Sequence, residues 1–412
     1  MRLTAANSIQ PSKLITHRYG ISDATNAYRL VVDNPNGEQF VGVVLDYDGS
    51  AETPSTKIDL KSSSAPLVSN NGNVRFGLIG AGNFMSGTIA PALLKTEHAE
   101  ISWVTSASGL SAADLGRKIN TPTVGSDYSE LISSPTVDAV ISATRHNLGA
   151  KIATESLLAG KPVHIEKPLA LSVEDLQVVA NAMQESDAML MVGFNRRFAP
   201  LVENLKQHFE SSRTPLSMLY RINAGWIEPD VWVHDPVEGG GRILGEVCHF
   251  IDLMQHICNS EPVRVQATRM KPDNKNVLAD DNVQVAITFS NGSTGTVIYS
   301  ALGAPTQPKE YVEVMGGRRS AVLDDFKTLT LYASSVETLK NKYGDKGHKK
   351  QFQIFADRIK SGGESPIPPR QLIASTLATL AVLMSLENGR SVSINSNEIS
   401  LDFGDTPNPS SV

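Results

Sequence analysis

The residues best suited to chemistry begin with a glycine-rich turn, Gly-Ala-Gly-Asn-Phe-Met at 80–85, which separates the apolar run Val74–Ile79 from a helical pattern. Glycines there let the chain turn tightly and let backbone N–H groups approach a pyrophosphate at a helix N-terminus. Met85 stands where a third glycine is usual, a position that governs packing rather than phosphate contact. We therefore expect a dinucleotide here, against the alternative of a glycine turn with no ligand. The residues expected to contact it are Gly80, Gly82, Asn83, Phe84 and Met85.

The chain after the next predicted strand, Ile101–Thr105, bears on which dinucleotide would bind. A carboxylate about 20 residues beyond the turn usually holds the ribose of NAD, but Ser106-Ala-Ser108-Gly109 has none. Small hydroxyl residues leave room for a 2′-phosphate and can donate hydrogen bonds to it, so the sequence favours NADP over NAD. The alternative is that Ser106 and Ser108 only cap the helix that follows.

Two polar loops follow predicted buried strands, Thr144–Asn147 after one and Glu166–Pro168 after the other. The carboxyl ends of parallel strands are where open α/β sheets bind ligands. A lysine at such a place can polarise a carbonyl or stabilise an alkoxide, although Glu-Lys-Pro alone is also a common surface tripeptide. The residues expected to contact the cofactor are Thr144, Arg145, His146, Glu166 and Lys167.

Further candidates lie beyond residue 220. His249, on an apolar helical stretch, could act as an acid or base from its free pKa of about 6.5. A histidine in such a place is more often a hydrogen-bonded core residue. Trp226, Trp232 and Asp235 lie in a turn-rich stretch that suits the face of a sugar. The alternative is that these tryptophans only pack the loop.

The elements that must position these residues form two parts. Between 73 and 193, short apolar strands alternate with helices, which predicts an α/β Rossmann domain with a parallel, doubly wound sheet. Between 194 and 400, strand-like runs with hairpin signals predict an α+β domain with a mostly antiparallel sheet. Residues 1–48 stand apart, 49–72 have the Ser- and Pro-rich composition of a linker, and 401–412 form a predicted tail.

The composition argues against several classes of function. The net charge is −6 without a basic run, so we expect neither nucleic acid nor a membrane surface as a partner. Cys248 and Cys258 would lie about 15 Å apart on one helix, too far for a disulfide. No metal-ligand spacing occurs, so we expect no metal. The absence of a secretory signal favours a cytoplasmic protein, and the uncharged stretch Leu372–Leu386 predicts a buried helix rather than a membrane span.

Taken together, several segments resemble the glucose-fructose oxidoreductase, inositol dehydrogenase and MocA (Gfo/Idh/MocA) family in order and spacing. The segments are 80–85, Thr144, 159–168, 193–198 and 239–252, and the resemblance covers roughly residues 73–395. It implies an NAD(P)-dependent oxidoreductase with NADP or NAD as cofactor. The implied substrates are sugar-like polyols, nucleotide sugars or cyclitols, or their keto forms.

The resemblance also implies roles for individual residues. Lys167 becomes the catalytic lysine and His249 the acid/base histidine, and the Lys167–Pro168 bond is expected to be cis. Arg145 and His146 would lie beside the nicotinamide. The residues expected near the substrate are Asn195, Arg197, Trp226, Trp232 and Asp235.

The sequence departs from the family at three positions. Arg145 replaces a proline, Gly149 a histidine, and Gly245 the aspartate that should stand one helical turn before His249. Glu246 lies three residues before His249, and residues three apart on a helix are neighbours. We therefore expect Glu246 to orient the imidazole as the third catalytic residue.

The run at 241–249 resembles a subgroup fused behind a medium-chain zinc alcohol dehydrogenase. Residues 1–48 resemble the last turns of that enzyme, a remnant without zinc ligands that cannot itself catalyse. The family also implies a homodimer or homotetramer. Two other functions stay open: a catalytically silent NAD(P)-binding sensor or assembly module, supported by the missing aspartate, and an oxidoreductase acting on a non-sugar carbonyl or imine.

Overall fold

The computed structural model describes residues 10–47, 56–60, 72–211, 214–271, 277–396 and residue 399. The chain divides into two compact units, residues 1–56 and residues 57–412. The predicted tail at 401–412 and most of the predicted linker at 49–72 lie outside the described residues.

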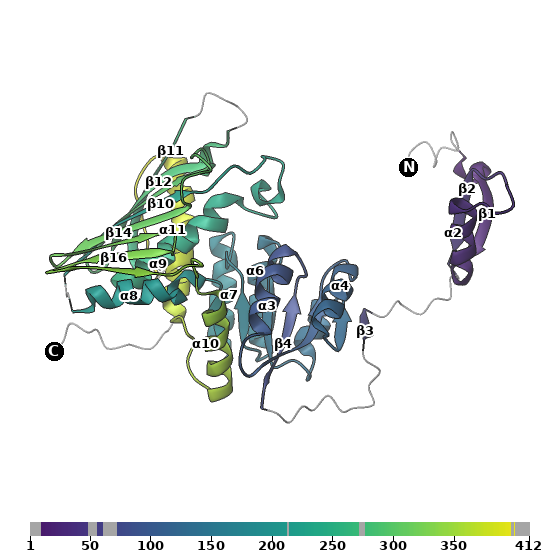
Figure 1. The fold of residues 1–412 in the computed structure, drawn as a ribbon, viewed down its shortest axis with the longest axis horizontal. Helices are drawn as coiled ribbons and strands as arrows, with labels where there is room; N and C mark the ends of the chain where they lie inside the picture. The colour runs from purple at the N-terminus through teal and green to yellow at the C-terminus, as the bar shows by residue number, and fades with distance from the viewer. Residues whose placement is uncertain are drawn as a thin grey trace. The chain divides into compact units, whose positions relative to one another are not determined.

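The first unit is a small β-α-β arrangement in which two strands pair in parallel (Figure 1). Its interior is correspondingly small: Ala27 and Leu30 are buried, whereas Tyr28 and Val32 of the same helix are 67% and 75% exposed. Its elements are η1 (Pro11–Leu14), β1 (Ile15–Gly20), η2 (Ile21–Asp23), α2 (Ala24–Val32) and β2 (Gly42–Asp46).

The second unit begins with the predicted Rossmann domain, which the structure confirms. Seven strands lie in the order β3-β6-β5-β4-β7-β8-β9; all are parallel except β3, which pairs antiparallel with β6. β3 lies inside the segment 49–72, which was predicted to be a linker. The sequence did not reveal this strand, because three residues are too few for a periodic signal. The strands are β3 (Lys57–Asp59), β4 (Val74–Ile79), β5 (Ala99–Thr105), β6 (Thr123–Gly125), β7 (Ala139–Ser142), β8 (Val163–Ile165) and β9 (Leu190–Val192).

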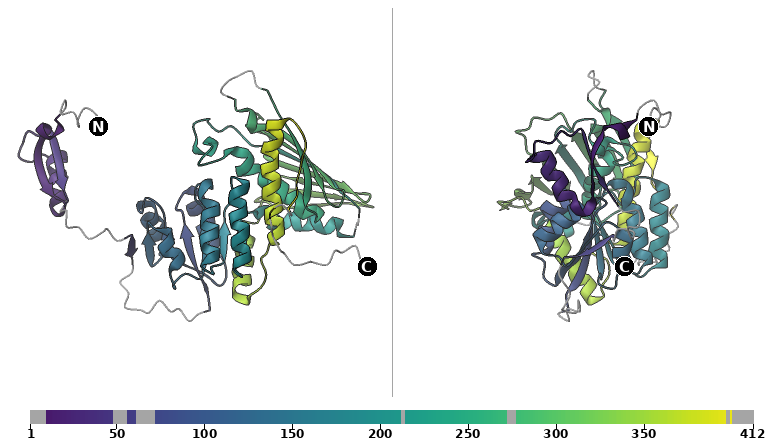
Figure 2. Two further views of the ribbon diagram at one scale, coloured as in Figure 1. Left: turned by 180° about the vertical axis from the view of Figure 1, so that it is seen from behind. Right: turned by 90° about the vertical axis from the view of Figure 1, so that its right-hand side faces the viewer.

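Helices flank this sheet on both sides (Figures 1 and 2). One of them, α10 (His348–Ser361), comes from near the end of the chain and packs against α3 and β4. Phe352 and Phe355 of α10 belong to the Rossmann core, so the predicted boundary that placed all of 194–400 in the second domain was wrong for this helix. The other helical elements are η3 (Met85–Ile89), α3 (Ala90–Leu93), α4 (Leu110–Ile119), α5 (Tyr128–Ser133), η4 (His146–Leu148), α6 (Gly149–Leu158) and α7 (Val173–Glu185).

The second domain is built on a nine-stranded sheet in the order β17-β16-β15-β14-β10-β13-β12-β11-β18. Among the described strands of this sheet, only β10 and β13 pair in parallel, which confirms the predicted, mostly antiparallel α+β domain. The strands are β10 (Ser217–Asn223), β11 (Pro262–Arg269), β12 (Asn282–Phe289), β13 (Thr294–Ser300), β14 (Glu310–Gly316), β15 (Arg319–Asp324), β16 (Thr328–Tyr332), β17 (Val336–Lys340) and β18 (Val392–Ser393).

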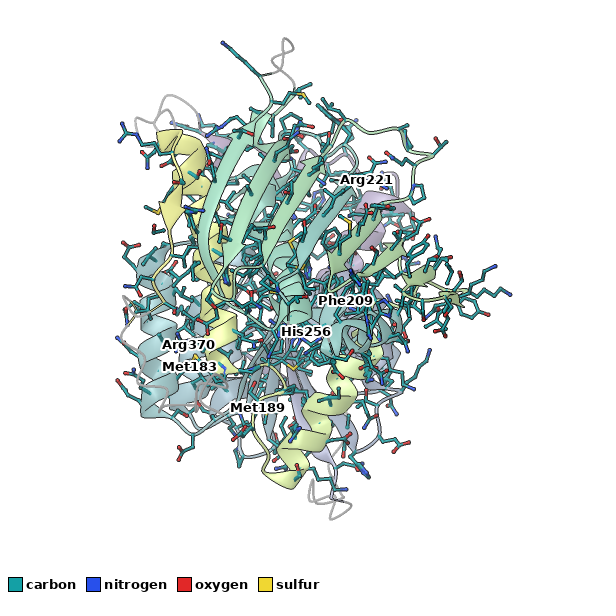
Figure 3. The ribbon with its side chains drawn as sticks, turned by 90° about the vertical axis from the view of Figure 1, so that its left-hand side faces the viewer. Met183, Met189, Phe209, Arg221, His256 and Arg370 are labelled. Atoms are coloured by element: carbon teal, nitrogen blue, oxygen red, sulfur yellow. The ribbon has the colours of Figure 1, made fainter. Side chains whose placement is uncertain are left out.

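Helices cover one face of this sheet and share a core with it. Figure 3 looks onto the opposite face, where Arg221 lies. The helical elements are η5 (Asn195–Phe198), α8 (Pro200–Glu210), η6 (Trp232–His234), η7 (Ile243–Val247), α9 (Cys248–Cys258), η8 (Ala279–Asp281) and α11 (Pro369–Asn388). Cys248 and Cys258 are free, buried thiols at the two ends of α9, as predicted.

The helix α11 is long and apolar enough to cross a membrane by length and composition alone, and 61% of its most apolar window is buried. Its side chains enter both cores: Ile373 lies in the Rossmann core, and Val382 lies in the core of the second domain. These contacts confirm the buried helix predicted at 372–386.

Two buried ion pairs join the domains directly after β9. Arg196 makes a bidentate contact with Glu310 on β14, with N–O distances of 2.8 and 2.9 Å. Arg197 does the same with Asp252 on α9, at 2.6 Å for both contacts. Asn195 donates its side-chain amide to the carbonyl of residue 346 at 2.8 Å.

These contacts correct the prediction that Asn195 and Arg197 meet the substrate. The Arg197 side chain is 4% exposed and also donates to Gln371, and Asn195 is 2% exposed. Both side chains are therefore occupied within the protein. Charged groups removed from water in this way need full pairing, and here the pairing fastens η5 to the second domain.

We predict that Asp252→Asn destabilises the protein by about 3–5 kcal/mol, because it leaves the buried guanidinium of Arg197 without its counter-charge. Urea unfolding measures the change. The exposed pair between Asp114 and Lys118 supplies the control, since Asp114→Asn should cost less than about 1 kcal/mol. Equal effects of the two substitutions would contradict the role of the buried pair.

We also predict that a variant lacking residues 1–55 keeps its melting temperature within a few degrees and still binds a nicotinamide dinucleotide, because the two units form separate compact bodies. This variant retains β3, the edge strand of the Rossmann sheet. Calorimetry and a fluorescence titration measure the two quantities. An insoluble or non-binding product would show that the first unit is part of the fold.

Candidate active site

The glycine turn at 80–85 keeps the backbone geometry that a dinucleotide needs. Gly80 has a φ of 93°, and a Cβ there would lie 2.4 Å from the carbonyl oxygen of Ala143, so only glycine fits. A Cβ on Gly82 would meet no atom within 4 Å. The turn therefore leaves open space beside a helix N-terminus, where a phosphate can bind.

The three residues after Gly82 differ in their exposure to solvent. Asn83 and Phe84 are exposed. The Met85 side chain is fully buried in the Rossmann core, so only its backbone N–H could reach a phosphate. The ring of Phe84 meets His348 of α10 edge-on, with 5.9 Å between centroids. Sequence reasoning did not single out His348 as a residue near the site, because Phe84 lies more than 250 residues away in the chain.

Ser106 and Ser108 form hydrogen bonds at the start of α4, as the alternative interpretation of a helix cap expected. Ser106 accepts a hydrogen bond from the backbone N–H of Ala112 at 3.1 Å, and its hydroxyl lies 2.7 Å from that of Ser111. The hydroxyl of Ser108 lies 2.9 Å from the same group. Capping leaves each hydroxyl with further hydrogen-bonding capacity, so it does not decide between NAD and NADP.

The loops after β7 and β8 lie side by side because these strands are paired. Thr144 follows β7, and its methyl group would lie 3.4 Å from a Cβ on Gly80. After β8, the ammonium of Lys167 donates to the carbonyl of Gly245 on η7 at 2.8 Å. The Lys167–Pro168 bond is cis, as predicted. The lysine thus meets the second domain at the edge of the sheet.

Glu166 lies next to this lysine and is half-buried, with the Oε1 atom of its carboxyl group inside the protein. A Cβ on Gly193 would come within 2.6 Å of both its carboxylate oxygens, so the glycine makes room for the carboxyl group. Burial raises the pKa of Glu166 to about 7, against the opposing charge of Lys167. The carboxyl group is therefore partly protonated near neutral pH.

These residues fit a nicotinamide dinucleotide. The open space at Gly82 and the helix N-terminus suit the pyrophosphate. The loops after β7 and β8, with Lys167, lie at the carboxyl ends of neighbouring strands, where the nicotinamide would bind.

His249 is 7% exposed near the start of α9. Burial, reinforced by the positive charges of Arg196 and Lys167, holds its pKa well below the ordinary value. The predicted contact with Glu246 is not formed. Glu246 instead pairs with Arg242 at 3.0 Å and with Lys309 at 3.5 Å. The reason is local, because residues 243–247 form a π-helical turn and the α-helical spacing behind the prediction does not apply.

The tryptophan-containing loop before η7 packs against the loop after β7. The ring of Trp232 meets His146 edge-on with 4.8 Å between centroids, and the guanidinium of Arg145 stacks on Trp232 at 4.2 Å. Asp235, predicted to meet the substrate, accepts hydrogen bonds at 2.8 Å from the backbone N–H groups of residues 237 and 238. The Oδ1 atom of this exposed carboxylate therefore holds the loop in shape, and its contact with a substrate stays a prediction.

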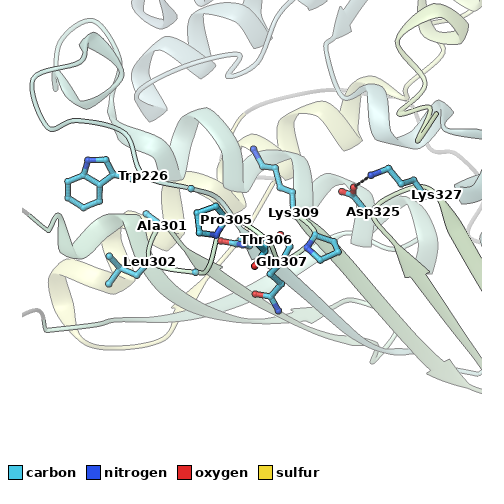
Figure 4. Close-up of a pocket in the computed structure, with 13 residues that line it drawn as sticks. Trp226, Ala301, Leu302, Pro305, Thr306, Gln307, Lys309, Asp325 and Lys327 are labelled. Carbon is cyan, nitrogen blue, oxygen red and sulfur yellow. Dashed lines mark hydrogen bonds and ion pairs between the residues drawn. The ribbon is translucent and has the colours of Figure 1, made fainter. Parts of the chain in front are cut away.

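A cavity of about 770 Å³ opens beside these elements, at the ends of β10 and β13 (Figure 4). Trp226 lines it and is 43% exposed, as suits a ligand-facing aromatic ring. Lys309 also lines it and links it to Glu246 of η7. Sequence reasoning found Trp226 but missed the rest, because no local motif marks the loop at 301–309. The other polar side chains of the lining are Asn223, Thr306, Gln307, Asp325 and Lys327.

Comparison with known proteins adds independent evidence. Residues 74–194 match the model of the oxidoreductase family with an NAD-binding Rossmann fold, and residues 214–322 match that of the GFO/IDH/MocA C-terminal domain. Neither match covers residues 1–48, so their likeness to an alcohol dehydrogenase stays a prediction.

Individual proteins are similar over most of the second unit. The uncharacterized oxidoreductase YrbE of Bacillus subtilis is 26% identical over 67% of this chain and 83% of its own length. Myo-inositol 2-dehydrogenase of Thermotoga maritima is 25% identical over 78% of this chain and 98% of its own. The structure of levoglucosan dehydrogenase with NADH and L-sorbose shares the fold, with a TM-score of 0.71 at 22% identity over 78% of this chain and 99% of its own.

The family matches together span more than half of the chain. They agree with the motifs in the sequence, the Rossmann sheet and the lysine at its edge. The chain belongs to the Gfo/Idh/MocA family of NAD-binding oxidoreductases.

Proposed function

We propose that this protein transfers hydride between a nicotinamide dinucleotide and a CH–OH group of a sugar-like polyol or cyclitol, or reduces its keto form. The observation that carries the proposal is Lys167, which reaches from the dinucleotide-binding edge to Gly245, four residues from His249. Myo-inositol 2-dehydrogenase and levoglucosan dehydrogenase are among the similar proteins. Their names support a polyol or anhydro-sugar substrate.

The two side chains have complementary chemistry. The ammonium of Lys167 can donate a hydrogen bond to the reacting oxygen and stabilise an alkoxide. His249 is neutral, because its pKa is low, and can accept a hydrogen bond or a proton from that oxygen. The nicotinamide, when bound, supplies the hydride acceptor or donor.

The cavity lined by Trp226 is the place we propose for the rest of the substrate. An aromatic ring beside amide, hydroxyl and ammonium groups suits a polyhydroxylated molecule. The helix-free face of the nine-stranded sheet is, in turn, the surface we propose for a homodimer or homotetramer.

A catalytically silent NAD(P)-binding module is the second candidate. It is favoured by the Nδ1 atom of His249, which is buried and has no hydrogen-bond partner within the described residues. Glu246 does not supply one. Turnover of a substrate separates the two functions.

We predict that Lys167→Ala and His249→Ala each lower kcat at least about a hundredfold once an active compound is found among cyclitols, anhydro sugars and nucleotide sugars. Lys151→Ala and His208→Ala are matched controls outside the site and should retain full activity. Parent-like turnover in both site variants would rule out this assignment. Tight cofactor binding without turnover of any carbonyl or alcohol would favour the silent module.

We predict that NADPH binds at least as tightly as NADH, because no carboxylate follows β5 to bind the ribose and repel a 2′-phosphate. Tryptophan fluorescence titrations measure both affinities. Ser106→Asp should reverse the preference and keep the hydrogen bond from the backbone N–H of Ala112, since a carboxylate also accepts hydrogen bonds. A clear preference of the parent protein for NADH would contradict the prediction.

A further inference from the structure

The imidazole of His146 fills the space that a side chain at position 245 would need. A Cβ on Gly245 would lie 2.9 Å from Cε1 of His146, 3.7 Å from Nδ1 and 3.8 Å from Nε2. The carbonyl of the same glycine accepts the hydrogen bond from Lys167 at 2.8 Å. His146 and Lys167, from neighbouring loops of the Rossmann domain, thus meet at one residue of the second domain.

The hydrogen bonds of His146 define its tautomer. Nδ1 lies 2.6 Å from the carbonyl oxygen of Gly239, which can only accept, so Nδ1 carries the proton. Nε2 then presents a lone pair, and no other described residue hydrogen-bonds to it. The ring of Trp232 packs against the imidazole in a T-shaped contact and helps to keep it in this orientation.

The charges around this ring keep it neutral. Burial, followed by the positive charges of Lys167 and Arg145, lowers the pKa of His146 to about 4, although the contact with Gly239 opposes the shift. Arg145 is itself paired with Glu238 at 3.5 Å. On the facing η7, Glu246 is turned toward Arg242 and Lys309. Within the described part of the chain, no carboxylate is therefore placed to raise the pKa of the ring toward neutral pH.

Resting on the proposed function, we propose that His146 is a further catalytic residue of this site: it, rather than His249, takes the proton of the substrate hydroxyl, and His249 is left to hydrogen-bond to the same oxygen. As the alcohol is oxidised, its O–H bond breaks and the proton passes to Nε2. The C–H bond breaks with its electron pair, as hydride, to the oxidised nicotinamide, and the C=O bond forms. Because His146 is partly exposed, it can release the proton to solvent.

His249 differs from His146 in the feature that matters for a base. Its Nδ1 is buried without a partner in the described part of the chain, so nothing there fixes its tautomer. A histidine base depends on a second group that orients the ring and sets which nitrogen is free. In this site the carbonyl of Gly239 does so for His146.

Two substitutions test the proposal in different ways. His146→Asn keeps an amide N–H for the carbonyl of Gly239 but removes the base. Gly245→Ala keeps His146 but places a methyl group where its ring lies. Both should lower kcat at least about a hundredfold, with KM and NADPH affinity changed less than about threefold. Gly87→Ala is the matched control, a glycine in the other π-helical turn where a Cβ meets nothing within 4 Å.

A measurement that needs no turnover accompanies the kinetics. In ¹⁵N-histidine spectra of the free protein, His146 should be the neutral Nδ1–H tautomer at pH 6. In Gly245→Ala the pKa of His146 should rise toward 6.5, because the ring is displaced into solvent.

Added imidazole should restore part of the activity of His146→Asn.

The outcomes separate this proposal from the proposed function. If the kcat of His146→Asn stays within threefold of the parent value while Lys167→Ala is inactive, the proposed dehydrogenase function is supported and His146 is not the base. If His146→Asn loses NADPH binding or its melting temperature falls sharply, its role is structural and the proposal fails. If Lys167→Ala is also fully active, the proposed function itself is wrong.

Discussion

Two adjacent buried ion pairs hold the Rossmann domain to the second domain, and the geometry of the site depends on them. Arg196 and Arg197 follow β9 directly, and their partners Glu310 and Asp252 lie on β14 and α9. Burial alone would raise the pKa of Glu310, but Arg196 and Lys346 hold it well below its usual range. Because each charge is removed from water, the pairs tolerate little displacement. They set α9 and η7 against the edge of the Rossmann sheet.

Burial at this junction then determines the charge of the site. The pKa of His348 is lowered to about 4, chiefly by burial and then by Arg196 and Lys346, and His146 and His249 are lowered for similar reasons. The histidines are therefore neutral at pH 7 beside the ammonium of Lys167. Neutral imidazoles next to a cation suit proton removal from an alcohol, because the cation stabilises the alkoxide that forms.

Two of the three departures from the family pattern, those at positions 145 and 245, are connected in space. Gly245 stands where the family resemblance implies an aspartate, and without a Cβ it leaves room for His146. Arg145, which replaces a proline, stacks on Trp232 and pairs with Glu238. Trp232 in turn supports the ring of His146. These two replacements belong to one packed group around a histidine, which a residue-by-residue comparison with the family cannot reveal.

The sequence by itself determined the parts that local patterns encode. The alternation of short strands and helices specified the Rossmann sheet, the glycine turn at 80–85 specified the open space at a helix N-terminus, and Glu-Lys-Pro specified the lysine at the edge of the sheet. Tertiary structure decided the rest, because side chains distant in sequence compete for the same partners. Arg197, expected at the substrate, is held by Asp252, and Glu246, expected at His249, is drawn to Arg242 and Lys309. No rule of sequence spacing predicts those partners, because each pairing depends on which elements the folded domains bring together and remove from water.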